Sequence, residues 1–293
     1  MTGLLPTTIF PLLAEVSPKA LPLFESSFLS FLTNSCFVAV IVLGIILGLT
    51  KKATTNMKLV PHRAQNAFEF VIEFLYGWVE MIVGKKVAPK AFPLLATLFI
   101  FILVANWFGL IPGVGTIGFG ESTKGYHLLD EVDTPLFRPA TADIHTTLGM
   151  ALAFMVVWLV ITLREVGIVH FLQHLFAPKG KFNNPIMYLL MVVIFFGVGI
   201  IEVISILIRP VSLSLRLYGN IFAGENLLHK MMTMLNGFGD VVGWIGRIVL
   251  PIPFYFMELL VGVVQAVVFT LLCAVYVMLS TAHDEEHGEE HAH

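Results

Sequence analysis

Charged side chains recur at a fixed spacing inside a long apolar stretch of the chain. Glu202, Arg209 and Arg216 follow one another at intervals of seven residues, and Asn220 and Glu225 come next. An arginine at mid-bilayer costs about 2.5–3.5 kcal/mol on insertion scales, so an ionisable residue within a membrane span indicates a functional site. On a helix turning about 100° per residue the first three lie near one stripe, with Asn220 about 40° further round. The spacing predicts a helix with one strongly polar face.

The carboxylates beyond this stripe could carry protons. Glu225 is nine residues past Arg216, which places it on the opposite side of the helix and about 13.5 Å along the axis, so it is not expected to pair with that arginine. Glu258 and Gln265 in the next apolar segment are seven apart and share a face. If the two segments form an antiparallel pair, Glu225 and Glu258 could meet, because both lie toward the turn that joins the segments.

Carboxylates and arginine have opposite uses in proton transfer. Two carboxylates in a wet cleft can exchange protons with water and with each other. The guanidinium of Arg216 stays charged and would repel a hopping proton. The combination predicts two proton-access routes separated by an arginine barrier, with the moving acid supplied by another subunit.

A purely structural interpretation of the same charges stays open. Arg209 could extend its head group toward the membrane interface, and Arg216 could pair within the helix bundle. A direct pair with Glu202 is excluded, since fourteen residues of helix span about 21 Å. The glutamates at 202, 225 and 258 could each be protonated and simply hydrogen-bonded.

The composition is that of an integral membrane protein. The 293 residues are 57% hydrophobic and 13% charged, with a mean hydropathy of +0.87. The long apolar segments lack the alternation of period two that strands show, which favours helices. A net charge of −3 gives no general basic surface for nucleic acid. Cys36 and Cys273 each lie in an apolar run and are interpreted as small buried hydrophobic residues, not as a redox pair.

The expected fold class is an all-α integral membrane protein with about five spans and one amphipathic surface helix. An external segment (1–30) precedes a single membrane domain (31–282) and an acidic, His-rich cytoplasmic tail (283–293). The spans are expected at about 31–50, 91–112, 144–164, 185–235 and 248–282, and the surface helix at about 62–83. Lys51 and Lys52 after the first span put that end in the cytoplasm and the amino terminus outside.

The two last spans are too long to stand upright. An unbroken helix from 185 to 235 would measure about 75 Å, against a bilayer core of about 30 Å. It must tilt or bend, and Pro210 offers a kink because it removes a helical hydrogen bond. The two long tilted helices are expected to form a hairpin.

Other polar residues have plain and functional interpretations. Asp143 precedes the third span and could cap that helix, mark a proton entrance, or do both. His170 and His174 are four apart, a spacing that could hold a metal, but no third ligand is evident, so solvated or interfacial histidines are preferred. No phosphate-binding Gly-rich loop, HExxH pair or nucleophile elbow is present, and no cofactor or metal is expected.

The stretch RPVSLSLRLYGNIFAGE (209–225) closely resembles the signature of the a-subunit family of F-type ATP synthases. The resemblance extends to Glu202, to QAVVF around Gln265, to KKAT after the first span and to PATADIHTTLGMAL in the third. It implies that Arg216 is the stator arginine facing a ring of c subunits. It also implies half-channels lined or bordered by Asn220, Glu225, Glu258 and Gln265, with Glu202 and Asp143 as further candidates.

The resemblance sets expectations for the rest of the molecule. Arg209 stands where the family tolerates Lys or Arg. Family members often pair an acid with a histidine at the positions of Glu225 and Glu258, whereas both are Glu here. The expected partners are the c ring, the b subunits of the peripheral stalk and the remaining synthase subunits, with ATP chemistry confined to those partners. A bacterial inner membrane is expected, with a plastid thylakoid as the alternative, and a self-contained ion channel or secondary transporter is the competing function.

Overall fold

The computed structural model describes residues 33–55, 57–111, 114, 118–119, 134–135, 137–176, 185–234, 246 and 249–281. The predicted external segment (1–30) and the predicted tail (283–293) lie outside these residues. Most of the predicted turn after the fourth span also lies outside them.

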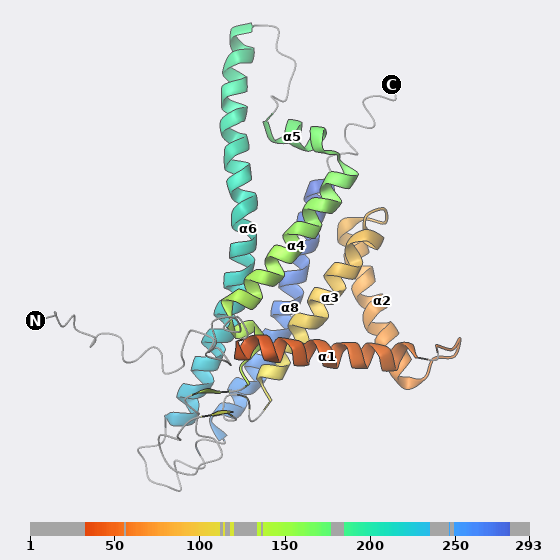
Figure 1. The fold of residues 1–293 in the computed structure, drawn as a ribbon, viewed down its shortest axis with the longest axis vertical. Coiled ribbons are helices and arrows are strands. Elements are labelled where there is room, and N and C mark those ends of the chain that lie inside the picture. Colours follow the sequence, from red (N-terminus) through yellow and green to blue (C-terminus); the bar gives the residue numbers. More distant parts are fainter. Residues whose placement is uncertain are drawn as a thin grey trace, which may run out of the picture. The chain divides into compact units, whose positions relative to one another are not determined.

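Seven α-helices make up most of the described chain (Figure 1). They are α1 (Asn34–Thr54), α2 (Arg63–Val83), α3 (Ala88–Gly109), α4 (Ile144–Glu165), α5 (Ile168–Phe176), α6 (Pro185–Thr233) and α8 (Pro251–Thr281). A 3-10 turn, η1 (Ala140–Ala142), precedes α4. Two short strands, β1 (Gly118–Phe119) and β2 (Thr134–Pro135), pair antiparallel with Gly118 opposite Pro135.

Five of these helices are long and apolar enough to cross a membrane, namely α1, α3, α4, α6 and α8. This confirms the predicted all-α membrane class. The fourth of them, α6, continues for 49 residues with Pro210 inside it. Almost none of its most apolar stretch is buried within the chain. Since such a surface is unfavourable in water, it is suited to lipid or to a partner.

The short helix α5 lies between the third and fourth spans, where the sequence predicts neither a span nor a surface helix. It begins directly after Gly167, whose φ of +84° lies in the left-handed region that a side chain disfavours. A glycine in this conformation ends α4 and lets the chain start again in a new direction. Among the residues of α5, His170 is exposed.

The described chain divides into two compact units. The first contains Met1–Lys52, Ile100–Thr147 and Arg216–Val267, and the second contains Ala53–Phe99, Leu148–Leu215 and Val268–His293. The core of the first unit joins α1, α3 and η1 through the fully buried side chains of Val38, Val42, Ala105 and Ala140. Aromatic rings close this core, with Phe37 and Phe137 at a centroid distance of 6.3 Å.

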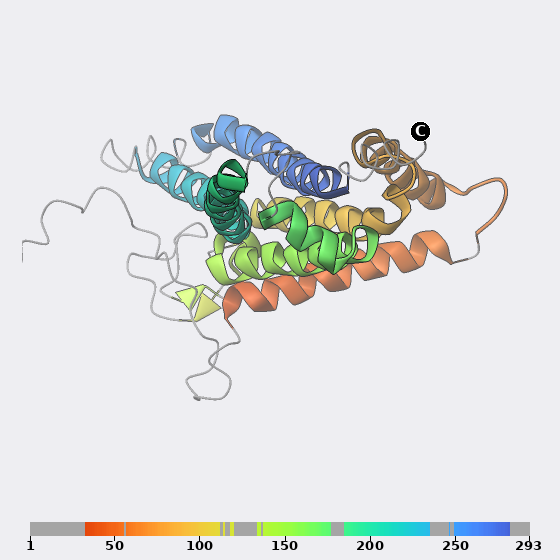
Figure 2. The ribbon, with the colours of Figure 1, turned by 90° about the horizontal axis from the view of Figure 1, so that it is seen from above.

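In the second unit α2 lies beside the first part of α3, as Figures 1 and 2 show. The rings of Tyr76 and Phe92 join these two helices edge to face, 5.1 Å apart. The helix α2 buries Leu75, Val79 and Val83 on one face, which fits the predicted amphipathic helix. Its position on a membrane surface stays a prediction.

The second unit also ties α4 to the end of α8. The indole nitrogen of Trp158 donates to the carbonyl of Tyr276 at 3.0 Å, and Thr162 Oγ1 donates to Ser280 Oγ at 3.0 Å. The Cys273 side chain is fully buried nearby along α8, as expected of a small hydrophobic residue, while Cys36 is partly buried. Both cysteines are free.

Candidate functional site

Helices α6 and α8 meet along a seam of polar side chains in the first unit. Asn220 Nδ2 on α6 donates a hydrogen bond to Gln265 Oε1 on α8 at 2.8 Å. Gln265 is 3% exposed, and within the described residues its Nε2 has no hydrogen-bond partner. The buried Gln265 amide is therefore held through its own Oε1, and its Nε2 group is available to donate a hydrogen bond along the seam.

The second contact along the seam brings an acid to the backbone of α6. A Cβ atom placed on Gly224 would collide with the carboxyl group of Glu258, a residue that is 6% exposed. The space that Glu258 occupies thus exists because residue 224 has no side chain. From the first contact to the second, the residue number increases along α6, from 220 to 224, and decreases along α8, from 265 to 258. This is the antiparallel arrangement that the sequence predicted, and it puts Glu258 next to the residue preceding Glu225.

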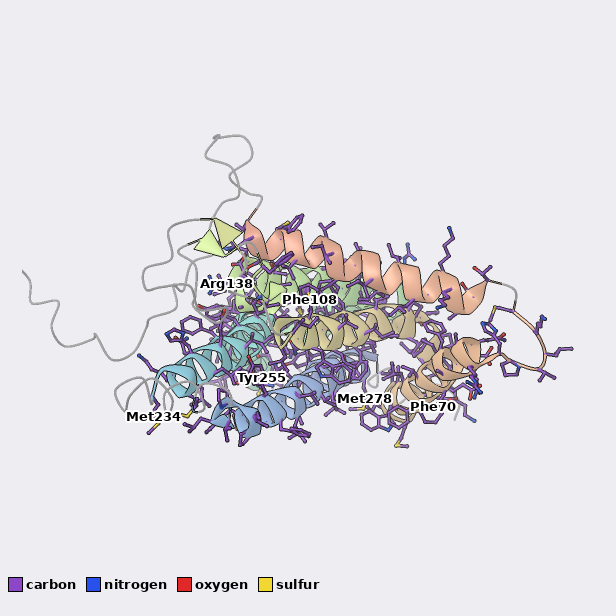
Figure 3. All side chains as sticks on the ribbon, turned by 90° about the horizontal axis from the view of Figure 1, so that it is seen from below. Phe70, Phe108, Arg138, Met234, Tyr255 and Met278 are labelled. Carbon is purple, nitrogen blue, oxygen red and sulfur yellow. The ribbon has the colours of Figure 1, made fainter. Side chains whose placement is uncertain are left out.

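Glu225 itself faces a cation from another segment. Arg138 Nη2 lies 4.0 Å from Glu225 Oε2. The side chain of Arg138 is 5% exposed and that of Glu225 is 25% exposed, so the acid is open to the surroundings of the chain and the guanidinium is not. Figure 3 shows Arg138 close to the cyan part of α6.

The segment carrying Arg138 is buried along its whole length. Residues 138–143 are all buried. Thr141 Oγ1 donates to Asn106 Oδ1 on α3 at 2.8 Å, and Asn106 Nδ2 donates to the carbonyl of Gly262 on α8 at 3.3 Å. These two hydrogen bonds connect Thr141, Asn106 and Gly262 in series. They fix the segment directly against α3 and, through Asn106, against α8.

Glycines permit the close approach of this segment to α3 and of α3 to α8. A Cβ on Gly109 would lie 2.7 Å from Cγ of Pro139, and a Cβ on Gly262 would lie 3.2 Å from Cβ of Asn106. The first distance is shorter than side-chain carbons tolerate. Larger residues at either position would push the segment or α3 away from its place.

Asp143 caps α4. Its Oδ1 accepts a hydrogen bond from the backbone N–H of His145 at 3.2 Å and lies 3.1 Å from Nδ1 of the same residue. The capping role that the sequence allowed is confirmed. The Asp143 carboxyl is buried while the His145 ring is 88% exposed, so the pair joins the interior to the surface.

The polar stripe of α6 is not uniform. Arg216 is exposed, between the exposed apolar residues Val211 and Leu215 on one side and Asn220 on the other. In the second unit, Glu202 and Arg209 are half-buried. The Arg209 guanidinium lies over the ring of Tyr276, 4.7 Å from its centroid, a cation–π contact that accounts for this charge without a proton-transfer role.

Comparison with known proteins gives the same assignment as the motif. The family model described as "ATP synthase A chain" matches residues 32–278. The chain belongs to the ATP synthase A chain family.

Known proteins similar to this chain match it over most of their own length. The chain is 31% identical to ATP synthase subunit a of Moorella thermoacetica over 249 residues, covering 85% of this chain and 88% of that protein. It is 31% identical to the subunit a of Acidothermus cellulolyticus, covering 88% and 79%. It is also 31% identical to that of Mycobacterium ulcerans, covering 87% of each.

The buried segment before α4 in this member of the ATP synthase A chain family was not predicted from its sequence. The sequence patterns described above assign no role to Arg138, Asn106 or Thr141. A signal was available in each case, since Asn106 is an amide inside an otherwise apolar span and Arg138 stands five residues before Asp143. Only the fold shows that Arg138 faces Glu225 on α6 and that Asn106 faces Gly262 on α8.

The chemistry available to this A-chain site is that of acids, amides and fixed cations. Within the part of the chain that the structure describes, no group of three His, Cys, Asp or Glu side chains could hold a metal. The seam instead offers two carboxyl groups, Glu225 and Glu258, with amides at one end and Arg138 at the other. Such groups can accept, release and orient protons.

Proposed function

We propose that this chain is the proton-translocating stator subunit of a rotary F-type ATP synthase, with two aqueous half-channels separated by Arg216. The observation that carries the proposal is the exposure of Arg216 on an apolar surface. An arginine directed into lipid is costly, whereas one that meets a carboxylate on a partner is compensated. A ring of c subunits, each with one acid, supplies such a partner in turn.

The outer half-channel runs along the seam between α6 and α8. Protons enter past Glu225, whose side chain is 25% exposed, and continue to Glu258, whose carboxyl lies against Gly224. They load onto a ring carboxylate, travel around with the ring, and leave through the cytoplasmic half-channel beyond Arg216. A fixed guanidinium between the two routes prevents a direct leak because it neither carries nor attracts a proton.

The remaining residues of the site have supporting roles. Asn220 and Gln265, hydrogen-bonded to each other, border the half-channel next to Arg216. Glu202 and Asp143 are further members of the proton path. Arg209, stacked on Tyr276, is an anchor or a charge that shapes the local field.

The partners follow from this assignment. We propose that the chain works with the c ring, the b subunits of the peripheral stalk and the other synthase subunits, and that ATP is made or hydrolysed only in those partners. Residues 31–282 act as one membrane domain in a bacterial inner membrane. The amino terminus lies outside and the carboxyl terminus lies in the cytoplasm, as Lys51 and Lys52 in the last turn of α1 indicate.

The direct test is Arg216→Ala in the assembled complex. We expect ATP-driven proton pumping and coupled synthesis to be abolished in inverted membrane vesicles while the complex still assembles. Arg164→Ala, at an exposed arginine in the last turn of α4, is the matched control and should pump normally. Full coupling in the Arg216 variant would overturn the proposal. Solute transport by the purified chain alone in liposomes would favour a self-contained transporter instead.

A further inference from the structure

The cation beside Glu225 has no role in the proton path described so far. We propose that Arg138 is a positioning residue that holds the Glu225 carboxylate in the outer half-channel. This inference rests on the proposed function, since it concerns how one acid of that path is kept in place. The pair is Arg138 Nη2 and Glu225 Oε2, at 4.0 Å.

Burial argues that the arginine acts on the acid and not on solvent. The Arg138 side chain is 5% exposed, whereas that of Glu225 is 25% exposed. A buried guanidinium is stable only when opposite charge and hydrogen bonds compensate it. Arg138 and Glu225 each make at least one further interaction as well.

The backbone that carries Arg138 is fixed from several sides. Pro139 lies against Gly109, Thr141 is hydrogen-bonded to Asn106, and Asp143 caps α4. A charge on such a support cannot follow the acid if the acid moves. Arg138 is therefore suited to define one position for the Glu225 carboxylate, as a preorganised site requires.

The chemistry of the two groups separates their tasks. Arg138 stays charged and passes no proton, so it cannot be a relay group. Glu225 can take a proton from water and release it toward Glu258, whose carboxyl lies against the neighbouring residue Gly224. The other acid of the segment, Asp143, lies five residues beyond Arg138 and is engaged by His145. Loss of Arg138 would leave the relay acid present but free to turn away.

The test compares Arg138→Gln, Arg138→Lys, Glu225→Gln and the double variant Arg138→Gln/Glu225→Gln in the whole synthase. Arg164→Gln is the control, because it makes the same change at an exposed arginine. Inverted vesicles report ATP-driven pumping, and vesicles stripped of the ATP-hydrolysing part report passive proton flux. The amount of this chain in the membrane normalises both rates.

A positioned proton-transfer group contributes about 10²- to 10⁴-fold, so we expect Arg138→Gln to lower both proton rates by about tenfold or more. Arg138→Lys should recover much of the rate because it keeps the charge, which a purely steric role would not require. The double variant should be no slower than Glu225→Gln alone, since Arg138 acts through that acid. The control should stay within about twofold of the natural protein.

Three results would overturn the inference. They are normal flux in Arg138→Gln, equal loss in the Lys and Gln variants, and a double variant whose loss is the product of the single losses. If Arg138→Gln fails to accumulate, the double variant decides: restored accumulation supports the charge pair, and continued absence rejects it. Pumping by Arg216→Ala tests the proposed function separately, so loss there with normal flux in Arg138→Gln would reject only this inference.

Discussion

Asn220 on α6 and Gln265 on α8 are joined by a side-chain hydrogen bond, 2.8 Å from Nδ2 to Oε1. The two residues lie 45 positions apart in sequence. Their bond sets the register of α6 against α8, because it holds the helical turn after Arg216, which carries Asn220, opposite the buried amide of Gln265. The position of Glu258 against Gly224 then follows about one turn further along α6.

This bond gives the first prediction. Gln265→Glu keeps an oxygen that can accept from Asn220, whereas Gln265→Leu removes it. A net hydrogen bond contributes about 0.5–1.5 kcal/mol, so the Leu variant should dissociate from the detergent-solubilised complex at a lower temperature than the Glu variant. Native gels after a series of heat steps measure this. Equal dissociation temperatures would show that the bond does not set the register.

The second prediction concerns Gly224. A methyl group there collides with the far end of the Glu258 side chain, which can move away at little cost in stability. We therefore expect Gly224→Ala to assemble but to lose about tenfold in proton pumping, since about 1.4 kcal/mol at the rate-limiting step is enough. Gly197→Ala in the same helix is the control, because its added Cβ would meet nothing within 4 Å. Equal pumping by the two variants would contradict the proposed position of the acid.

Thr141 provides the third prediction. Thr141→Val keeps the shape but removes the hydroxyl that donates to the buried Asn106, and an unsatisfied buried group costs about 1–3 kcal/mol. The variant should accumulate less in the membrane and lose the complex at a lower temperature, while Thr141→Ser should behave normally. Thr97→Val is a matched control, since that exposed hydroxyl bonds only to carbonyls of its own helix among the described residues. Equal destabilisation of Thr97→Val would contradict the prediction, because the loss in Thr141→Val would then not be specific to the bond with Asn106.

The fourth prediction separates two uses of Asp143. Asn can accept the N–H of His145 as Asp does, so Asp143→Asn should keep the helix cap, whereas Asp143→Ala should lose about 1 kcal/mol of stability. We also expect Asp143→Asn to slow passive proton flux, because the amide cannot carry a proton. Heat stability and flux are measured on the same vesicles. Normal flux in the Asn variant would leave capping as its whole role.

The fifth prediction contrasts the two arginines of the signature. Lys in place of Arg209 can still stack on the ring of Tyr276, a contact of about 0.5–2 kcal/mol, so Arg209→Lys should pump nearly normally. Arg216→Lys should not, because a lysine can release its proton and lacks the planar, permanently charged head. Rates of ATP-driven pumping at equal membrane content compare them. A greater loss of pumping in Arg209→Lys than in Arg216→Lys would indicate that Arg209, and not Arg216, is the essential arginine.

The five long apolar helices could be predicted from the sequence because each apolar run is long and bounded by charges. The facing of Glu258 and Gln265 toward α6 also followed from a local rule, their spacing of seven. Arg138 could not be placed in this way. Its burial depends on Asn106 and Gly262, more than thirty and more than a hundred residues away, and composition alone identifies such a segment only as a loop.

The division of the chain into separated stretches affects how the protein is made. The first unit takes residues from Met1–Lys52, Ile100–Thr147 and Arg216–Val267. A chain still under synthesis can therefore have α1, α3 and even Arg216 in the membrane while Glu258 and Gln265 remain inside the ribosome. No acid seam exists until the last helix arrives. If the seam is the outer half-channel proposed above, a partly made chain therefore contains no complete path for protons.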